Sequence, residues 1–233
     1  MEAASAAGII VVFCTVIIGT GLFWRYVWFF RNPPRNVPPG ECIVSPADGT
    51  VVYVKIVQPG EKVIAIKEGV EARIEDIVKE DICCRKLLIG IFMSPFDVHY
   101  NRAPIAGKVE SIRHYPAGTK NIHMTSMHYR TLFGIPPFYK NSLHIIENER
   151  SVTRIGARFK GEDVRFYVVQ IGGGSVNGID SYVSDGEELT KGQIFGMIRI
   201  GSQVDLVTTF NESMKIRVRA GDKVFAGESI IVE

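Results

Sequence analysis

The sequence predicts a mostly β protein: an antiparallel barrel or sandwich body, preceded by an N-terminal hydrophobic helix. Three observations lead to this prediction. Short apolar runs rich in Val and Ile recur along the chain, separated by Gly, Pro, Asp and Asn, which favour turns. Only residues 70–79 have a helical pattern, and it is brief. An uncharged stretch, residues 3–24, stands apart at the N-terminus.

Composition narrows the class of protein. The chain has 233 residues, 46% hydrophobic and 22% charged, with a formal net charge of +2. It can bury a substantial core, which excludes a disordered chain, a collagen-like fibre and a disulfide-stapled miniprotein. Because only one long apolar stretch is present, a polytopic membrane protein is also excluded. The basic residues are dispersed, so nucleic acid is not expected as a partner.

Residues 1–31 are expected to form a membrane anchor. At about 1.5 Å per residue, a helix over the uncharged stretch can cross a hydrocarbon core of about 30 Å. Aromatic residues then alternate with Arg25 and Arg31, which suits the headgroup layer and favours the cytoplasmic face for the rest of the chain. In-plane or hairpin insertion, a signal peptide and a buried helix are alternatives, but Met1 and Glu2 provide no basic segment of the signal-peptide kind.

Two boundaries follow from the composition after the anchor. Residues 32–40 contain four prolines and are expected to form a stiff linker, and the body is expected to extend over residues 41–233. The strands expected in the body are residues 43–44, 51–57, 63–66, 87–93, 109–112, 143–146, 164–171, 194–200 and 230–232.

Two segments near the C-terminus, residues 185–194 and 220–230, resemble each other. Each has a glycine turn, an apolar residue and a second glycine turn. Hairpin turns of this kind are typical of small lipoyl- or biotinyl-type domains, so a carrier domain is one hypothesis. Lys215 lies too close to Gly221 to be a carrier lysine in its own hairpin, and it is interpreted as a solvated strand residue.

The four cysteines are interpreted as small apolar side chains in a reducing compartment. Cys14 lies in the apolar stretch, Cys42 stands alone, and Cys83 and Cys84 are adjacent. This arrangement is neither a Cys-x-x-Cys redox pair nor a zinc spacing, so no metal site is expected.

Three segments place a reactive side chain among turn residues. Asp48 lies between Pro-Ala and Gly at the entry to an expected strand, and His99 follows an apolar strand, where a general base is well placed. Ser202 follows Gly201 between two β-type runs. Glycine permits unusual φ values, so a strained Gly-Ser bond with a neighbouring base can be attacked by its own serine. Taken singly, each segment is more typical of a turn, a structural histidine or a bulge.

Together and in this order, the segments resemble the short-form phosphatidylserine decarboxylases. The similarity begins at residues 28–31 and extends over nearly all of the chain to the C-terminus. It rests on Ser-Pro-Ala-Asp-Gly at 45–49, Met-Ser-Pro-Phe-Asp-Val-His-Tyr-Asn-Arg-Ala-Pro at 93–104, Glu-Asn-Glu-Arg at 147–150 and Phe-Gly-Met-Ile-Arg-Ile-Gly-Ser at 195–202.

This resemblance implies a proenzyme that cuts itself between Gly201 and Ser202. Asp48 would orient and charge-stabilise His99, and His99 would deprotonate Ser202 so that its Oγ attacks the Gly201 carbonyl. β-Elimination of the resulting ester would release the β chain and leave dehydroalanine at position 202, which would tautomerise and be hydrolysed by water to a pyruvoyl group with loss of ammonia. The products would be a β chain, residues 1–201, and an α chain, residues 202–233, which is too short to fold alone and must stay in the sheet.

The resemblance also implies the reaction. The pyruvoyl ketone would form a Schiff base with the serine amine of phosphatidylserine and take up the electrons left when carbon dioxide departs, giving phosphatidylethanolamine without an exogenous cofactor. A second role of His99 in proton transfer is a hypothesis. The expected partners are a serine phospholipid and the membrane, and a homo-oligomer is left open.

The sequence departs from the family pattern in several places. Gln203 follows the reactive serine where relatives usually carry Ser, Thr or Arg. Residues 172–180 replace a stretch that often carries paired arginines, with Asn177 and Gly178 at the corresponding places, and they create a second Gly-Ser pair at residues 174–175. The flanks of Ser202 favour it as the cleavage site. Phe96 stands where long-form relatives have a histidine, so a proton donor carried by that residue is absent.

Residues 118–142 form a longer loop than a short form requires. Its aromatic residues and lysines suit a membrane-facing lid that admits the headgroup, and a surface loop packed on its own body is the alternative. His114, His123, His128 and His144 are assigned no catalytic role.

Other interpretations of the function stay open. An archaeal ether lipid or a soluble amino acid is an alternative substrate, although the anchor disfavours a soluble one. A non-catalytic, β-rich membrane module that keeps the fold is the alternative outside enzymes, and the joint presence of Asp48, His99 and Ser202 argues against it.

Overall fold

The computed structural model describes residues 2–67, 69–80, 84–174, 178–199 and 201–233. Its contacts divide the chain into two units, Met1–Pro33 and Pro34–Glu233. The first unit contains helix α1 (Glu2–Phe23), which continues as a π-helical turn, η1 (Trp24–Trp28). Gly8–Trp28 is long and apolar enough to cross a membrane, and it is the one such helix in the part of the chain that the structure describes.

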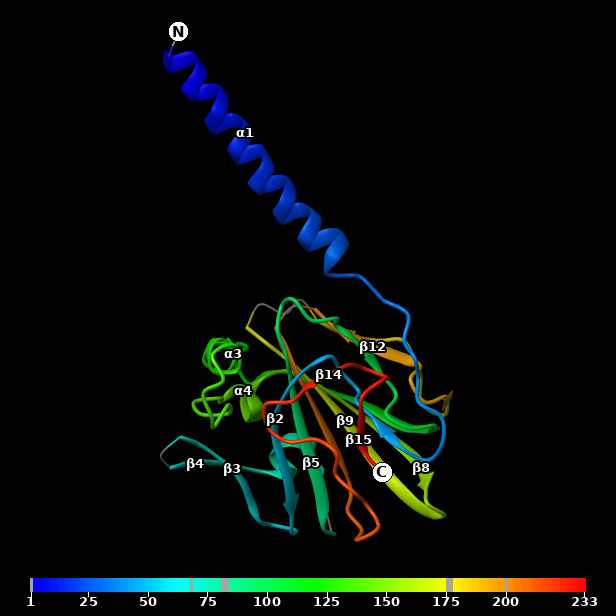
Figure 1. Cartoon of the computed structure of the whole chain (residues 1–233). Coiled ribbons are helices and arrows are strands. Elements are labelled where there is room, and N and C mark those ends of the chain that lie inside the picture. The colour runs from blue at the N-terminus through cyan, green and yellow to red at the C-terminus, as the bar shows by residue number, and fades with distance from the viewer. Residues whose placement is uncertain (1, 68, 81–83, 175–177, 200) are drawn as a thin grey trace. The chain divides into compact units, whose positions relative to one another are not determined.

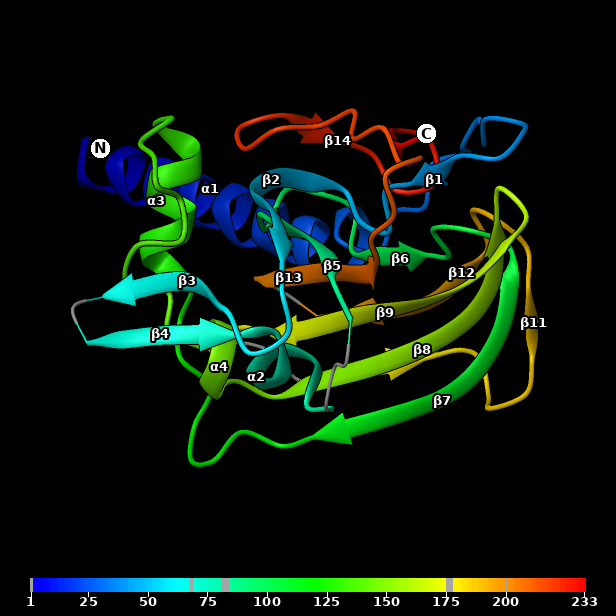
Figure 2. The ribbon, with the colours of Figure 1, turned by 90° about the horizontal axis from the view of Figure 1, so that it is seen from below.

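The second unit, the body, is built on one eight-stranded antiparallel sheet with the order β11-β7-β8-β9-β13-β5-β2-β14. Figure 2 shows β7, β8 and β9 curving together, which gives the sheet the form of a half-barrel. The predicted antiparallel β body with an N-terminal hydrophobic helix is therefore confirmed. The strands of this sheet are β2 (Gly49–Val57), β5 (Lys86–Met93), β7 (Gly107–Tyr115), β8 (Arg150–Phe159), β9 (Glu162–Gly172), β11 (Glu188–Leu189), β13 (Ser202–Thr209) and β14 (Lys223–Val224).

Smaller sheets and short helices surround the large sheet. One small sheet has the order β10-β12-β6, β1 pairs with β15, and the hairpin of β3 and β4 extends from the body in Figure 1. The strands are β1 (Ile43–Val44), β3 (Lys62–Lys67), β4 (Val70–Arg73), β6 (Tyr100–Arg102), β10 (Ile179–Ser181), β12 (Ile194–Ile198) and β15 (Ile230–Val232), and the helices are α2 (Ile74–Val78), α3 (Thr125–Leu132) and α4 (His144–Glu147).

Both faces of the central strands are buried. In β5, Ile91 and Met93 face a core shared with β1, β12 and β15, whereas Leu88 and Phe92 face a core shared with α2, α3, α4 and the β3–β4 hairpin. We call these the strand-covered core and the helix-covered core. Because successive strand residues alternate between the two, β5 reads as one continuous apolar run in the sequence.

Three local predictions are wrong. Residues 70–79 are not one helix, because β4 occupies the first half and α2 the second. Residues 143–146 fall in α4 rather than in a strand, and the buried guanidinium of Arg150 donates a hydrogen bond of 2.8 Å to the Ile145 carbonyl. The expected loop 118–142 contains α3. Short apolar segments fit both periodicities, so their residues alone do not decide between a helix and a strand. Cys83, Ser175 and Asn177 lie outside the described residues.

The two similar glycine segments do form similar turns. Gly186, Gly192, Gly221 and Gly227 all have positive φ, between +77° and +102°. Glycine adopts this conformation without steric cost, which explains its repetition at these four places. The likeness to lipoyl-type domains stays a prediction.

Candidate active site

The three segments singled out in the sequence meet at one end of the central strands. Thr50 of β2 pairs with Phe92 of β5, and Phe92 pairs in turn with Gln203 of β13. The next row of the sheet holds Met93 and Ser202, which are direct partners. Asp48 immediately precedes β2, and His99 follows β5 after a short turn, so both are delivered to the end of the sheet where Ser202 begins β13.

The Gly201–Ser202 bond lies where the chain passes from the small β12 sheet into the large sheet. Gly201 has φ +62°, in the left-handed region that L side chains rarely adopt. Its carbonyl oxygen is packed against Gly173, where an added Cβ would lie 2.1 Å from that oxygen. Two glycines therefore permit this backbone geometry: Gly201 at the bond itself, and Gly173, which packs against the Gly201 carbonyl.

Ser202 is completely buried and faces the strand-covered core. Its Oγ donates to the Met93 sulfur at 3.4 Å, and the same sulfur accepts a contact of 3.7 Å from Asn101 Nδ2. Asn101 is held by Gln170, whose Nε2 donates to Asn101 Oδ1 at 2.8 Å. A thioether is a weak acceptor, so the serine hydroxyl is positioned without a strong competing hydrogen bond.

The local turn before His99 fixes its imidazole. Asp97 Oδ2 accepts a hydrogen bond of 2.7 Å from the Ser94 N–H and so stabilises the turn after β5. The carbonyl of Asp97 then lies 2.9 Å from His99 Nδ1. A carbonyl can only accept, so Nδ1 carries a hydrogen, and in the neutral ring Nε2 holds the basic lone pair. His99 is fully buried.

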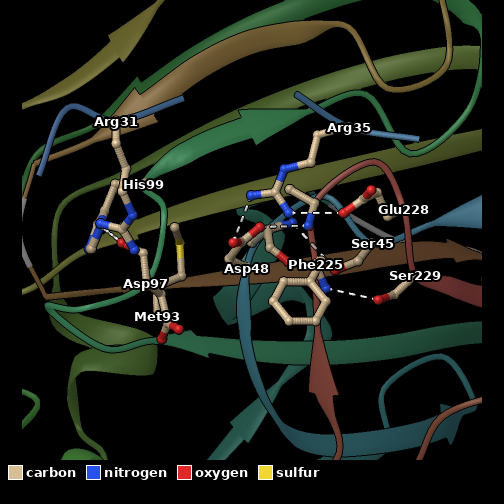
Figure 3. Close-up of polar contacts among 12 residues, drawn as sticks. Arg31, Arg35, Ser45, Asp48, Met93, Asp97, His99, Phe225, Glu228 and Ser229 are labelled. Atoms are coloured by element: carbon tan, nitrogen blue, oxygen red, sulfur yellow. Dashed lines mark hydrogen bonds and ion pairs between the residues drawn. The ribbon is translucent and has the colours of Figure 1, made fainter. Parts of the chain in front are cut away.

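The hydrogen bonds of Asp48 go elsewhere than to His99, as Figure 3 shows. Arg35 donates to Asp48 Oδ2 at 2.8 Å, the Ala226 N–H donates to Oδ1 at 2.7 Å, and Arg35 also contacts Glu228 at 3.2 Å. Burial raises the pKa of Asp48, an effect that the Ala226 N–H and the Arg35 guanidinium oppose. Arg35 lies in the Pro-rich segment and was not among the residues predicted to belong to the site.

Gln203 belongs to a buried polar network on the helix-covered face. Its Nε2 donates to Tyr53 Oη at 2.6 Å and to Asp205 Oδ1 at 2.7 Å, and its Oε1 accepts from His144 Nε2 at 3.0 Å. Tyr53 also donates to the Asp205 carboxylate at 2.8 Å. Burial raises the pKa of Asp205 to about 6 and lowers that of His144 to about 4. The spacing of Gln203 and Asp205, two residues apart in one strand, was the available signal that they share a face.

A cavity of about 200 Å³ lies beside Gly201. Its lining is drawn from the end of β5 and the turn after it, the start of α3 and the glycines after β9: Phe92, Pro95, His123, Met124, Thr125, His128, Gly173, Gly174 and Gly201. Neither histidine was given a role from the sequence, because their nearness to Gly201 depends on contacts between distant segments.

Comparison with known proteins agrees with this geometry. The family described as phosphatidylserine decarboxylase matches residues 22–232. A Methanopyrus kandleri protein named "Putative archaetidylserine decarboxylase proenzyme" is 34% identical over 92% of this chain and 84% of its own length. A Streptomyces coelicolor protein named phosphatidylserine decarboxylase proenzyme is 33% identical over 89% of this chain and 72% of its own length.

The names of the family and of these relatives support the assignment of this β-rich chain to the class of lipid decarboxylase proenzymes. The chain belongs to the phosphatidylserine decarboxylase family. The family resemblance found in the sequence is confirmed.

Proposed function

We propose that this chain cleaves itself between Gly201 and Ser202 and then decarboxylates the serine headgroup of a phospholipid, phosphatidylserine or its ether-linked counterpart. The observation that carries the proposal is the buried Ser202 hydroxyl directly after a left-handed glycine. The family assignment and the oriented imidazole of His99 support it.

Self-cleavage is assigned to Ser202 and His99. His99 Nε2 takes the proton of the Ser202 hydroxyl, and Oγ attacks the Gly201 carbonyl carbon. The peptide C–N bond then breaks as the ester forms, and the proton passes from His99 to the released amine of residue 202. The Asp97 carbonyl holds the imidazole in the tautomer that this step needs. The close packing of Gly173 on the Gly201 oxygen fixes the carbonyl while Oγ approaches.

The assignment of Asp48 stays a prediction. Its role was to orient and charge-stabilise His99, whereas its hydrogen bonds in the structure are with Arg35 and the Ala226 N–H. The Asp97 carbonyl accounts for the orientation of the ring. We therefore assign Asp48 the electrostatic part of the role, which release from Arg35 would strengthen.

The surroundings of Ser202 fit a pyruvoyl group. That group lacks the amine and the hydroxyl of serine, so it occupies less space, and its methyl can lie against the Met93 thioether that now contacts Oγ. Once formed, the group supplies a ketone that binds the headgroup amine and accepts the electron pair left by departing carbon dioxide.

The C-terminal fragment has a structural reason to remain after cleavage. Residues 202–209 form β13, which pairs with β5 on one side and with β9 on the other, in the middle of the large sheet. β14 and β15 then pair with β2 and β1. The α chain, residues 202–233, is thus held by strands of residues 1–201 at three places.

Membrane association is the remaining part of the proposal. Residues 1–31 are assigned as the anchor, with the body on the cytoplasmic face, on the strength of the apolar helix and the arginines after it. α3 and the residues after it present exposed apolar side chains, Tyr129, Leu132, Phe133 and Ile135. These suit contact with the lipid surface, as expected of a lid over residues 118–142.

The test is release of labelled carbon dioxide from carboxyl-labelled phosphatidylserine in mixed micelles with the purified full-length protein. We expect turnover by the wild type, none by Ser202→Ala, and normal turnover by the control Ser213→Ala, an exposed serine of the same fragment. Turnover by Ser202→Ala would refute the assignment of the reactive residue. A cleaved wild type that releases no carbon dioxide from the ester or the ether lipid would refute the assigned reaction.

A further inference from the structure

The cavity beside Gly201 lies on the opposite side of β13 from the groups assigned to self-cleavage. Phe92 and Met124 form part of its lining and belong to the helix-covered core, whereas Met93 belongs to the strand-covered core that Ser202 faces. The two sides meet at Gly201, which lines the cavity. His123 and His128, which line the cavity, can therefore be changed without altering the residues that carry out self-cleavage.

The rim of the cavity is polar and its floor is apolar. His123 and Thr125 are exposed, His128 is half-buried, and Phe92 and Met124 are buried. Among the described residues, the buried Nδ1 of His128 has no hydrogen-bond partner. The ring of His128 lies 6.0 Å from that of Phe92, between centroids. The cavity is thus lined by two imidazole rings, those of His123 and His128.

The N-terminus of α3 opens on the same cavity. Met124 and Thr125, its N-cap and first residue, both line it, and within the described chain neither a capping side chain nor an acidic residue occupies the first turn. The unsatisfied N–H groups of a first helical turn favour anions. Together with two histidines, this makes the cavity a site for an acidic ligand.

The position of His123 is set by its neighbours. Asn148 accepts a hydrogen bond from the Ile122 N–H and donates to the Ile122 carbonyl, both at 2.8 Å, and its Nδ2 donates to the Gly172 carbonyl at 2.7 Å. These bonds tie the residue before His123 to the end of β9. A Cβ added to Gly174 would lie 2.6 Å from the His123 ring, so glycine at 174 is what allows the ring to lie there.

We propose that this cavity binds the acidic serine phosphodiester headgroup through His123, His128 and the N-terminus of α3, and that the hydrocarbon chains of the lipid stay outside it. This inference rests on the proposed function and names the part of the substrate that is recognised. At about 200 Å³, the cavity is smaller than the roughly 300–1,000 Å³ of pockets for drug-sized ligands, so it holds a headgroup and excludes the chains. Ester- and ether-linked serine lipids then become equivalent substrates.

The first test is binding of sn-glycero-3-phosphoserine, which has the headgroup and no chains, to the full-length Ser202→Ala protein in detergent micelles. Binding is followed by titration calorimetry and by the histidine ring signals in NMR spectra. We expect the double variant His123→Gln/His128→Gln to bind at least roughly a hundredfold more weakly, as two lost hydrogen bonds to a charged group predict. Gly174→Ala keeps both histidines but displaces the ring of His123, so it should also weaken binding.

The controls separate this site from general anion binding. His114→Gln changes an exposed histidine of β7 and should leave the affinity unchanged. Inorganic phosphate and glycerophosphoethanolamine, which lacks the carboxylate, should bind more weakly than glycerophosphoserine. The proposal would be overturned if the double variant bound glycerophosphoserine as tightly as its parent does. It would also be overturned if the parent bound inorganic phosphate as tightly as glycerophosphoserine, or did not bind glycerophosphoserine.

Two further measurements complete the test: self-cleavage of the double variant, and the preference of the processed enzyme for the linkage of the lipid's hydrocarbon chains. When Ser202 is retained, the double variant should still cleave itself, because its changes lie across β13 from His99 and Ser202. Loss of cleavage would contradict the separation of the cavity from the self-cleavage residues. Processed wild type should turn over diacyl and dialkyl-ether serine lipids within roughly threefold of each other. A larger preference would refute the exclusion of the chains. Failure of cleavage in the wild type would refute the proposed function and leave the binding result standing.

Discussion

The pH dependence of stability should reveal the buried pair of Asp205 and His144. In the native protein the pKa of Asp205 is raised from 3.8 to about 6 by burial, against the hydrogen bonds from Gln203 and Tyr53. The pKa of His144 is lowered from 6.5 to about 4, again by burial, with Gln203 opposing and Arg150 assisting. At about 1.4 kcal/mol per pKa unit, each shift corresponds to about 3 kcal/mol of unfolding free energy.

The two contributions have opposite signs. As pH rises from 4 to 6, the unfolded state loses the proton of Asp205 before the native state does, so this carboxyl lowers the free energy of unfolding. Over the same range the unfolded state loses the proton of His144 while the native imidazole is already neutral, so this group raises the free energy of unfolding. In the wild type the two contributions nearly cancel.

Removing one partner should expose the contribution of the other. Relative to the parent, we expect His144→Gln to lose about 2 kcal/mol of stability between pH 4 and pH 6, and Asp205→Asn to gain about 2 kcal/mol, since part of each contribution lies outside this pH range. The difference from the parent at each pH removes the background of surface carboxylates, which all three proteins share.

The measurement is urea unfolding of full-length protein in detergent micelles, in the Ser202→Ala background so that one chain is present. Far-UV circular dichroism is used because it reports on the sheet, whereas both tryptophans, Trp24 and Trp28, lie in the N-terminal unit. If both variants follow the pH dependence of the parent, neither group titrates as the structure requires, and the reasoning from burial is refuted.

Three other changes test separate parts of the account. Gly201→Ala should slow self-cleavage about tenfold on a time course of gel-separated fragments, because alanine at φ +62° costs about 1–2 kcal/mol; an unchanged rate would show that this conformation is not needed. Arg35→Ala leaves the carboxylate of Asp48 buried without its cation and should lower the free energy of unfolding by about 3 kcal/mol at neutral pH, with Arg35→Lys intermediate; a loss below about 1 kcal/mol would count against the pair. Leu132→Glu should reduce turnover on phosphatidylserine vesicles severalfold and leave turnover of dispersed short-chain lipid unchanged; equal effects on both would argue against a membrane contact of α3.

Much of the fold was accessible from the sequence because its signals are local. The apolar stretch before Arg25 and the Val- and Ile-rich runs predict the helix and the β body, and both are present. Residues 143–146 show where such signals fail. Four residues fit a strand or a helical turn equally well, and the choice of α4 is accompanied by the Arg150 side chain, which donates to the carbonyl of Ile145.

The candidate site shows the same division. The segments around His99 and Ser202 stand out by their residue types, and pairing of β5 with β13 brings their strands together. The contact of Asp48 with Arg35 was not accessible, because it depends on how the Pro-rich segment folds back. The cavity with His123 and His128 joins four segments between Phe92 and Gly201, and no local pattern predicts that arrangement.

The central claim is the conversion of Ser202 during self-cleavage, and the intact mass of the denatured wild-type protein tests it most directly, beside Ser202→Ala. The account predicts two chains, residues 1–201 and 202–233, with the C-terminal chain lighter by one ammonia than the same fragment beginning with serine. It also predicts a single uncut chain for Ser202→Ala. An uncut wild type, a break at another bond, or a C-terminal chain with an intact N-terminal serine would contradict the account.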